Sequence, residues 1–139
     1  MSEETTINAL YPVITDNNKH FYDSIENGEL VANQCDDCHH TFLPPAKNCP
    51  NCLSENVDWT ALSCEGSVYS YVEYHRPYHE AFKDKVPYVV AIVELKEGPR
   101  LISNILDYDL KTLRVGAPLE AVFTKGLSNF PIVQFRQKI

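Results

Sequence analysis

Four of the five cysteines occur in two closely spaced pairs, a pattern typical of a metal site. Cys35 and Cys38 form one C-x2-C pair, and Cys49 and Cys52 form a second pair after ten intervening residues. In each pair a tight turn directs two thiolates to one point, so two pairs complete a tetrahedron around Zn²⁺. Because four thiolates leave no coordination position for water or substrate, the predicted site is closed and structural.

Two other interpretations of these cysteines stay open at the level of sequence. The same four thiolates could hold iron in a site of rubredoxin type, which has the same geometry. Alternatively, they are two unrelated pairs of buried free thiols. His39 and His40 follow the first pair and could compete as ligands. Since four cysteines already fill the coordination shell, we expect both histidines to lie on the surface.

Cys64 lies outside the two pairs and raises a separate question of catalysis. A lone cysteine with histidines elsewhere in the chain could be a nucleophile, activated here by His75 or His79. Free cysteine is also a common small buried residue, and no local signature of a thiol enzyme surrounds Cys64. A structural role is therefore the alternative to a catalytic one.

The elements that position the cysteines begin with a short helix. Residues 16–29 place His20, Phe21, Ser24 and Ile25 near one helical face. Asp16 is expected as the N-cap and Gly28 as the stop signal. A helix of this length is marginal alone in water, so it must dock on its own chain or on a partner.

The rest of the chain has two regions of different amino-acid composition. Residues 30–57 have too few apolar side chains for a core, so a metal must replace it there. After Trp59, apolar and β-branched runs separated by glycine and proline predict five strands. These are Ser67–His75, Tyr88–Leu95, Arg100–Leu106, Leu119–Lys125 and Ile132–Arg136.

Five strands with an excursion between the third and fourth match a small Greek-key barrel of the OB type. A five-stranded SH3-like barrel is the structural alternative. The sequence thus predicts a mainly β fold with an N-terminal helix, a rubredoxin-like zinc ribbon and a C-terminal five-stranded OB-fold barrel. The expected domains are an N-terminal helical arm over residues 1–29, the zinc ribbon over 30–57 and the barrel over 58–139.

Residues 69–88 form the richest polar and aromatic stretch, and their second part, 76–87, is expected as a long loop at the barrel mouth. OB folds bind ligands at such loops. Aromatic side chains with arginine suit an anionic or planar ligand, or a partner protein. The residues of this stretch predicted to contact such a ligand or a partner are His75, Arg76, Tyr78 and Phe82. In the alternative, Tyr69, Tyr71 and Glu73 are cross-strand packing residues and His75 and Arg76 a solvated strand end.

Charge limits the partners that the chain can bind. It has 12 lysines and arginines against 19 aspartates and glutamates, a formal net charge of −7, so its overall field repels polyanions. OB folds and zinc ribbons recur in proteins that bind single-stranded nucleic acid, which makes this the alternative function. Such proteins use a basic groove, which the net charge opposes.

The N-terminal residues are acidic and polar, and no stretch approaches the ~18 apolar residues that span a bilayer. We therefore expect a soluble, cytoplasmic protein. In a reducing compartment, cysteines are expected to bind metal rather than to form disulfides.

Taken in order, the segments of the chain resemble the zinc-ribbon and OB-fold family of acyl-CoA-associated proteins, from about Phe21 to Phe135. The resemblance is carried by CDDCHHTFLPPAKNCPNC, Trp59, GSVYSYV, PYVVAIVEL, EGPRLISNI and LRVGAPLEAVF. It implies a non-catalytic accessory subunit that bridges or stabilises a thiolase-like, acyltransferase, hydratase or aldolase-type enzyme and helps to hold CoA. The catalytic cysteine and histidine would then belong to the partner.

The chain departs from that family's pattern at three places. His39 stands where the family often has glycine after the second cysteine. Ala46 replaces an arginine after the proline pair, which moves the expected basic contact with CoA phosphate to Lys47. Cys64 and Glu65 replace a small and a basic residue before the first barrel strand, which argues against a phosphate contact at that turn.

Overall fold

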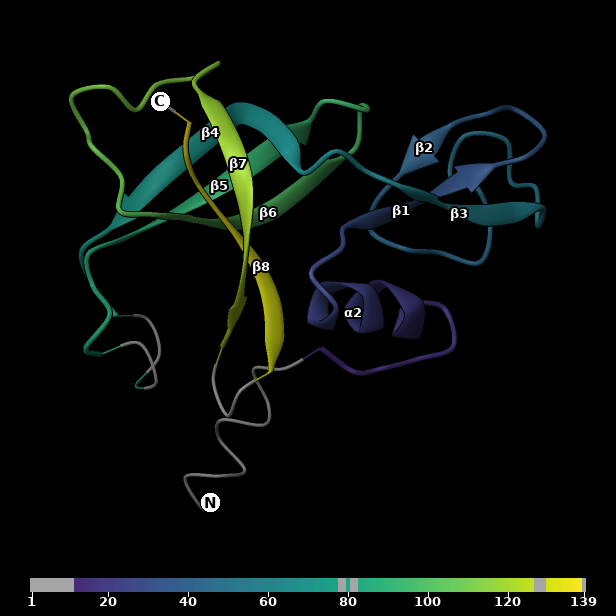
Figure 1. Cartoon of the computed structure of the whole chain (residues 1–139), viewed down its shortest axis with the longest axis horizontal. Coiled ribbons are helices and arrows are strands. Elements are labelled where there is room, and N and C mark those ends of the chain that lie inside the picture. The colour runs from purple at the N-terminus through teal and green to yellow at the C-terminus, as the bar shows by residue number, and fades with distance from the viewer. Residues whose placement is uncertain (1–11, 78–79, 81–82, 127–129, 139) are drawn as a thin grey trace.

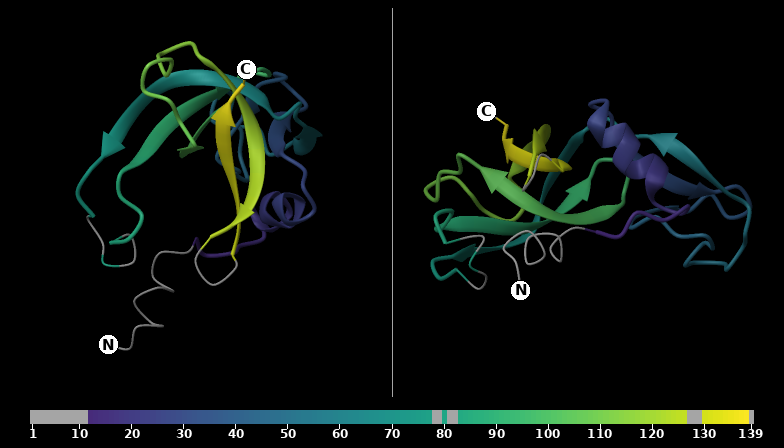
Figure 2. Two further views of the ribbon diagram at one scale, coloured as in Figure 1. Left: turned by 60° about the vertical axis from the view of Figure 1, so that its left-hand side comes forward. Right: turned by 90° about the horizontal axis from the view of Figure 1, so that it is seen from below.

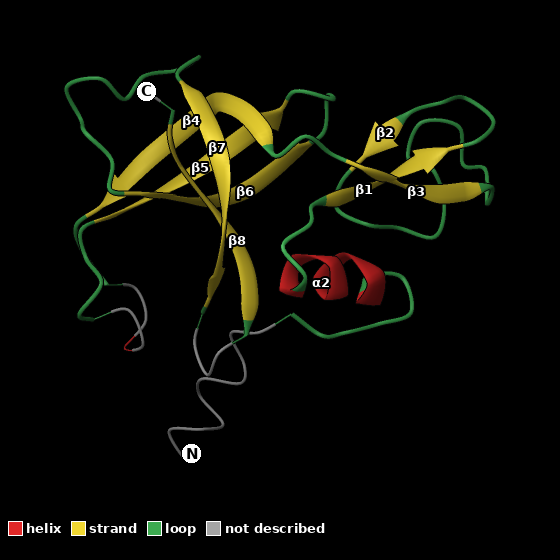
Figure 3. Ribbon diagram, viewed as in Figure 1, coloured by secondary structure: helices red, strands yellow, loops and turns green. Residues whose placement is uncertain are grey.

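A computed structural model describes residues 12–77, 80, 83–126 and 130–138, which form a short helix, a three-stranded sheet and a closed barrel (Figure 1). The helix is α2 (Lys19–Glu26). The strands are β1 (Val31–Cys35), β2 (Thr41–Phe42), β3 (Val57–Ala61), β4 (Glu65–Tyr74), β5 (Tyr88–Leu95), β6 (Arg100–Leu106), β7 (Pro118–Lys125) and β8 (Pro131–Gln137). The predicted mainly β fold is confirmed (Figure 3).

The barrel closes in the strand order β4-β5-β6-β8-β7. Its neighbouring strands are antiparallel except for β6 and β8, which run parallel. The predicted strand ends lie within two residues of the observed ones because glycine and proline breaks bound the apolar runs. The excursion between β6 and β7 contains a turn closed by the Leu113 amide, which donates to the Asp109 carbonyl at 2.8 Å.

Strand β5 shows how the sequence pattern builds the barrel wall. Val89, Ala91, Val93 and Leu95 are buried, while the residues between them are half-buried. Because successive side chains of a strand point to opposite faces, this alternation directs one face into the barrel. The other face lies on the barrel exterior, where further elements of the chain can pack.

The three-stranded sheet places β1 between β2 and β3 in antiparallel pairing. It lies at one end of the barrel (Figure 2). Strand β3 begins at residue 57, so the expected boundary between residues 57 and 58 falls inside this strand. Leu30, Ala32 and Leu62, which flank or belong to the sheet, are buried in the same hydrophobic cluster as the barrel. The sheet and the barrel therefore share one core.

Helix α2 lies against β8 and β1 (Figures 1 and 3). It begins later than expected: its N-cap position is Asn18, so the prediction of Asp16 was wrong. The reason is a turn before the helix, in which the Asn18 side chain accepts from the Thr15 amide at 2.8 Å and donates to the Val13 carbonyl at 2.9 Å. Gly28 follows the helix with φ +78°, as its predicted role requires.

An ion pair joins the end of β8 to the start of β4. Lys138 Nζ lies 2.5 Å from Glu65 Oε1, and this bond, followed by the nearby charges of Lys138 and Lys96, lowers the pKa of Glu65. A lowered folded-state pKa contributes stability above the unfolded pKa and loses it as pH falls through the folded value.

We expect Lys138→Met to lower the free energy of unfolding near neutral pH. The difference from the wild type should shrink progressively as pH falls below about 4, because Glu65 is protonated first in the unfolded state and then in the folded state. Urea titrations across this pH range measure it. Lys111→Met is the control, since Lys111 is exposed and has no ion pair within the described part of the chain. A difference that grows in acid would contradict the assignment.

Candidate functional site

The four paired cysteines converge on one point. Each offers one Sγ atom, and all four Sγ atoms lie within 4.8 Å of one another. Cys35 and Cys52 are 3.5 Å apart and Cys38 and Cys49 are 3.6 Å apart. A tetrahedral zinc ion with bonds of about 2.3 Å requires sulfur separations of about 3.8 Å. The cysteine cluster, Cys35, Cys38, Cys49 and Cys52, therefore has the dimensions and the donor chemistry of a Zn²⁺ centre.

The two C-x2-C turns have the same backbone conformation. His39 follows the first pair with φ +65°, and Leu53 follows the second with φ +66°. The His39 amide donates to the Cys35 carbonyl at 2.9 Å, and the Leu53 amide donates to the Cys49 carbonyl at 2.8 Å. This left-handed position explains why glycine suits the place of His39, since glycine adopts positive φ without a steric cost.

Nearby amides donate to the sulfur atoms. The Cys38 amide donates to Cys35 Sγ at 3.4 Å, and the Asn51 amide donates to Cys49 Sγ at 3.4 Å. The Asn51 side chain donates to Cys38 Sγ at 3.5 Å, and this bond is the largest cause that lowers the pKa of Cys38 to about 6. The bond from Asn51 favours the Cys38 thiolate, the protonation state in which cysteine binds a metal.

Polar side chains tie the two turns together. Asp37 in the first turn accepts from the Ser54 hydroxyl and, at 3.1 Å, from the Asn56 side chain. These bonds, with that of Ser54 the larger cause, lower the pKa of Asp37. Asn33, 3% exposed in β1, accepts from the Ala46 amide at 3.0 Å and so fixes the loop between the turns. The cluster is thus held by its own loops as well as by any bound metal.

The remaining cysteine and the histidines take the positions expected for structural residues. His39 and His40 are exposed, and the cysteine cluster does not include them. Cys64 directly precedes β4 and His75 directly follows it, so this ten-residue strand separates them by about 30 Å. Activation of Cys64 by His75 is therefore excluded, and His79 lies outside the described residues. Burial, as the largest cause, raises the pKa of Cys64, which opposes thiolate formation.

The structure does not bring the predicted contact residues to one place. Lys47 is exposed in the loop of the ribbon, whereas His75 and Arg76 are exposed after β4. The ribbon and the segment after β4 lie at opposite ends of the molecule (Figures 1 and 2). Tyr78 and Phe82 lie outside the described residues. The described members of the predicted contact set therefore lie at two separate places.

The end of β4 carries a polar network. Glu73, whose side chain is 17% exposed, lies 2.8 Å from His75 Nε2. Tyr108 donates its hydroxyl to Glu73, and this bond is the largest cause that raises the pKa of Tyr108 to about 12. Tyr71 donates to the Leu113 carbonyl at 3.1 Å. The alternative prediction of packing roles for Tyr71 and Glu73 agrees with these contacts, because both residues tie β4 to the excursion after β6.

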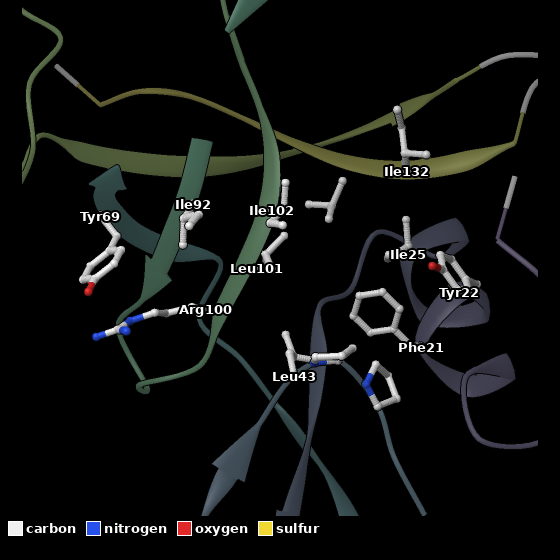
Figure 4. Close-up of a pocket in the computed structure, with 13 residues that line it drawn as sticks. Phe21, Tyr22, Ile25, Leu43, Tyr69, Ile92, Arg100, Leu101, Ile102 and Ile132 are labelled. Carbon is white, nitrogen blue, oxygen red and sulfur yellow. The ribbon is translucent and has the colours of Figure 1, made fainter. Parts of the chain in front are cut away.

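An apolar groove on the outer surface of the barrel was not predicted from the sequence (Figure 4). Its volume is about 610 Å³, and it lies between α2, residues 43–45 and the strands β4, β5, β6 and β8. One signal was present: Phe21 and Ile25 share a helical face, and both line the groove. The contribution of Arg100 and Ile102 had no local signal in the sequence, since only the pairing of the barrel strands brings them to the same groove as the helix.

Within the described residues, no helix is both long and apolar enough to cross a membrane. The fold and the cysteine cluster together define a zinc-ribbon protein joined to an OB-type barrel. Comparison with known proteins agrees with this class. Residues 23–58 match the family model for the rubredoxin-like zinc ribbon domain of ChsH2, and residues 59–124 match that for the C-terminal OB-fold domain of ChsH2.

Several known proteins have sequences similar to this one. A DUF35 domain-containing scaffold protein of Methanothermobacter thermautotrophicus is 39% identical over 69% of this chain and 72% of its own length. A probable enoyl-CoA hydratase alpha subunit of Thermomonospora curvata is 36% identical over 78% of this chain. The chain spans only 33% of that longer relative. The chain belongs to the DUF35 family, in which the Methanothermobacter relative is named a scaffold protein.

Solved structures give the same assignment. The chain resembles one in a structure described as an Ltp2-ChsH2(DUF35) aldolase, with a TM-score of 0.81 and 32% identity, covering 93% of this chain and 100% of that one. A DUF35-family protein from Sulfolobus solfataricus matches with a TM-score of 0.67 at 17% identity, which shows the shared fold. The zinc-ribbon and OB-fold prediction is thereby confirmed.

Proposed function

We propose that this chain is a non-catalytic scaffold subunit that binds and stabilises an acyl-CoA-handling enzyme of hydratase, aldolase or thiolase type. The carrying observation is the similarity, across the whole of the matched chain, to the ChsH2(DUF35) component of an aldolase structure. The names of two relatives support the connection with acyl-CoA chemistry. One is a probable enoyl-CoA hydratase alpha subunit, and the other is a 3-oxo-4,17-pregnadiene-20-carboxyl-CoA hydratase alpha subunit of Mycobacterium tuberculosis.

In this proposal, Cys35, Cys38, Cys49 and Cys52 hold one structural Zn²⁺. Four thiolates fill a tetrahedral shell, so the bound ion would supply folding energy rather than a site for substrate. The ribbon that they stabilise carries part of the core shared with the barrel. Metal binding thus supports the surface that a partner would recognise.

This chain is also proposed to contact CoA. Lys47 beside the ribbon and His75 with Arg76 beyond β4 are candidates for its phosphates, with Tyr78 and Phe82 for its planar or apolar parts. Because the first of these places lies far from the second (Figure 1), one CoA molecule would use either the ribbon or the barrel end. In both cases the reacting thioester would lie on the catalytic subunit.

Purification of the tagged chain from its own cells tests the proposal. We expect about one zinc per chain, from the four-thiolate site, and a stoichiometric acyl-CoA hydratase, aldolase or thiolase. The catalytic subunit purified alone should be less active or less stable than the reconstituted complex. Recovery of the chain with nucleic acid, or an enzyme indifferent to its presence, would contradict the proposal. A gel shift with single-stranded DNA at low salt checks the nucleic-acid alternative directly.

A further inference from the structure

The apolar groove is formed where three parts of the chain meet. Phe21, Tyr22 and Ile25 of α2 form one side, and Leu43 lies at its floor between the helix and the barrel (Figure 4). The strands β4, β5, β6 and β8 form the other side. Strands β6 and β8 pair only near Ile105 and Leu106. They diverge toward their N-terminal ends, where their residues line the groove.

Charge distinguishes the two ends of the groove. Among the described residues that line it, Arg100 alone carries a charge, whereas the chain as a whole has a formal net charge of −7. Arg100 and Tyr69 lie at the end away from α2 (Figure 4). An occupant that fits this surface is therefore apolar along its length and acidic at one end.

The guanidinium of Arg100 is already held in position. Its carbon lies 3.9 Å from the centroid of the Tyr69 ring, and its Nε donates to Glu94 at 3.2 Å. The described part of the chain gives its two terminal nitrogens no hydrogen bond. Arginine binds carboxylates through such paired donors, so a second carboxylate can be added without moving the side chain.

The openness of the groove favours a polypeptide over a small ligand. Ile102 is 72% exposed and Tyr69 is 45% exposed. Small-molecule sites enclose about 70–90% of the ligand surface, which a groove whose walls project into solvent does not do. Exposed apolar side chains with tyrosine and arginine are typical of the centres of protein interfaces.

We infer that the groove is the docking site for the catalytic subunit, which contributes an apolar segment whose aspartate or glutamate pairs with Arg100. This inference rests on the proposed function and adds to it the surface and the chemistry of the contact. A second copy of this chain is a poorer occupant, because two molecules of net charge −7 repel each other.

The first test compares two substitutions in the complex purified from the protein's own cells. Ile102→Glu places a negative charge in the groove beside the expected acidic segment, so recovery of the catalytic subunit should fall at least tenfold. Leu110→Glu is the matched control, because Leu110 is 54% exposed, lies in the β6–β7 excursion and does not line the groove. Its complex should be recovered at the wild-type level. Zinc content and melting temperature confirm that both variants fold.

The second test is site-specific photo-crosslinking of the intact complex. Benzoylphenylalanine in place of Ile102 should crosslink to the catalytic subunit at an apolar segment that contains an aspartate or glutamate. The same probe in place of Leu110 should not. Arg100→Glu should weaken the complex, and reversal of the crosslinked acidic residue to lysine should restore it.

Several outcomes would overturn the inference. An intact complex with Ile102→Glu, or crosslinks from position 110 alone, leaves the proposed function standing and removes the groove as its docking site. Crosslinks to a second copy of the chain, or Ile102-dependent binding of decanoic acid in a complex that Ile102→Glu leaves intact, assign the groove to another occupant. If the wild-type chain recovers no acyl-CoA enzyme, the proposed function and this inference fail together.

Discussion

Cys49→Ser should remove the metal and lower the melting temperature by about 10 °C or more, because structural zinc contributes its binding free energy to folding. Cys49 is fully buried within the cysteine cluster, so the substitution replaces a metal-binding thiolate by a hydroxyl that no solvent can reach. Zinc content should fall from about one per chain to a small fraction. Atomic absorption and a thermal melt of the same sample measure both effects.

Cys64→Ser is the matched control for this experiment. Cys64 is a half-buried thiol outside the cluster, so the same chemical change should leave the zinc content unaltered. Its effect on the melting temperature should be a few degrees at most, about the cost of one partly buried side chain. A Cys49→Ser protein that retains zinc and melts like the wild type would show that these cysteines hold no structural metal.

Phe135→Ala should lower the free energy of unfolding by about 3–5 kcal/mol, the usual cost of a large cavity in a protein core. Phe135 is fully buried in β8, at the closure of the barrel, where it is paired with Ile105 of β6 and Ala121 of β7. Urea denaturation measures the loss. Ile102→Ala is the control, since Ile102 is 72% exposed on the neighbouring strand and should cost under about 1 kcal/mol.

Trp59 fluorescence, followed during the same urea denaturation of Phe135→Ala, also tests whether the ribbon and the barrel share one core. Trp59, the single tryptophan, belongs to β3 in the ribbon sheet rather than to the barrel. Because Leu30, Ala32 and Leu62 join the barrel core, we expect its fluorescence transition to shift by the same amount as the circular dichroism transition. A Trp59 transition that stays at the wild-type midpoint would mean that the ribbon unfolds separately.

The shared core connects the cysteine cluster to the apolar groove. Loss of zinc would loosen β1 and β3, and α2 packs against this sheet through His20, whose ring lies 4.9 Å from that of Trp59. The same helix forms one side of the groove. The ribbon therefore supports the position of α2 as well as its own loops.

The features that depend on neighbours along the chain could be predicted from the residues alone. Two C-x2-C pairs determine the cysteine cluster, because each turn brings its own thiols together. Strand bounds followed from glycine, proline and alternating apolar residues, as in β5. The helix was predicted from its apolar face, but its start was misplaced, because the side-chain bonds of Asn18 and not those of Asp16 close the preceding turn.

Which distant residues lie together depends on the three-dimensional fold and could not be predicted from local patterns. The length of β4 keeps Cys64 away from His75, and it carries the segment that follows β4 to the end of the molecule opposite the ribbon (Figure 1). The groove arises because β6 and β8 diverge beside α2, which brings Arg100 opposite Phe21. Such contacts depend on the order in which strands pair across the barrel, and side-chain periodicity carries no information about that order.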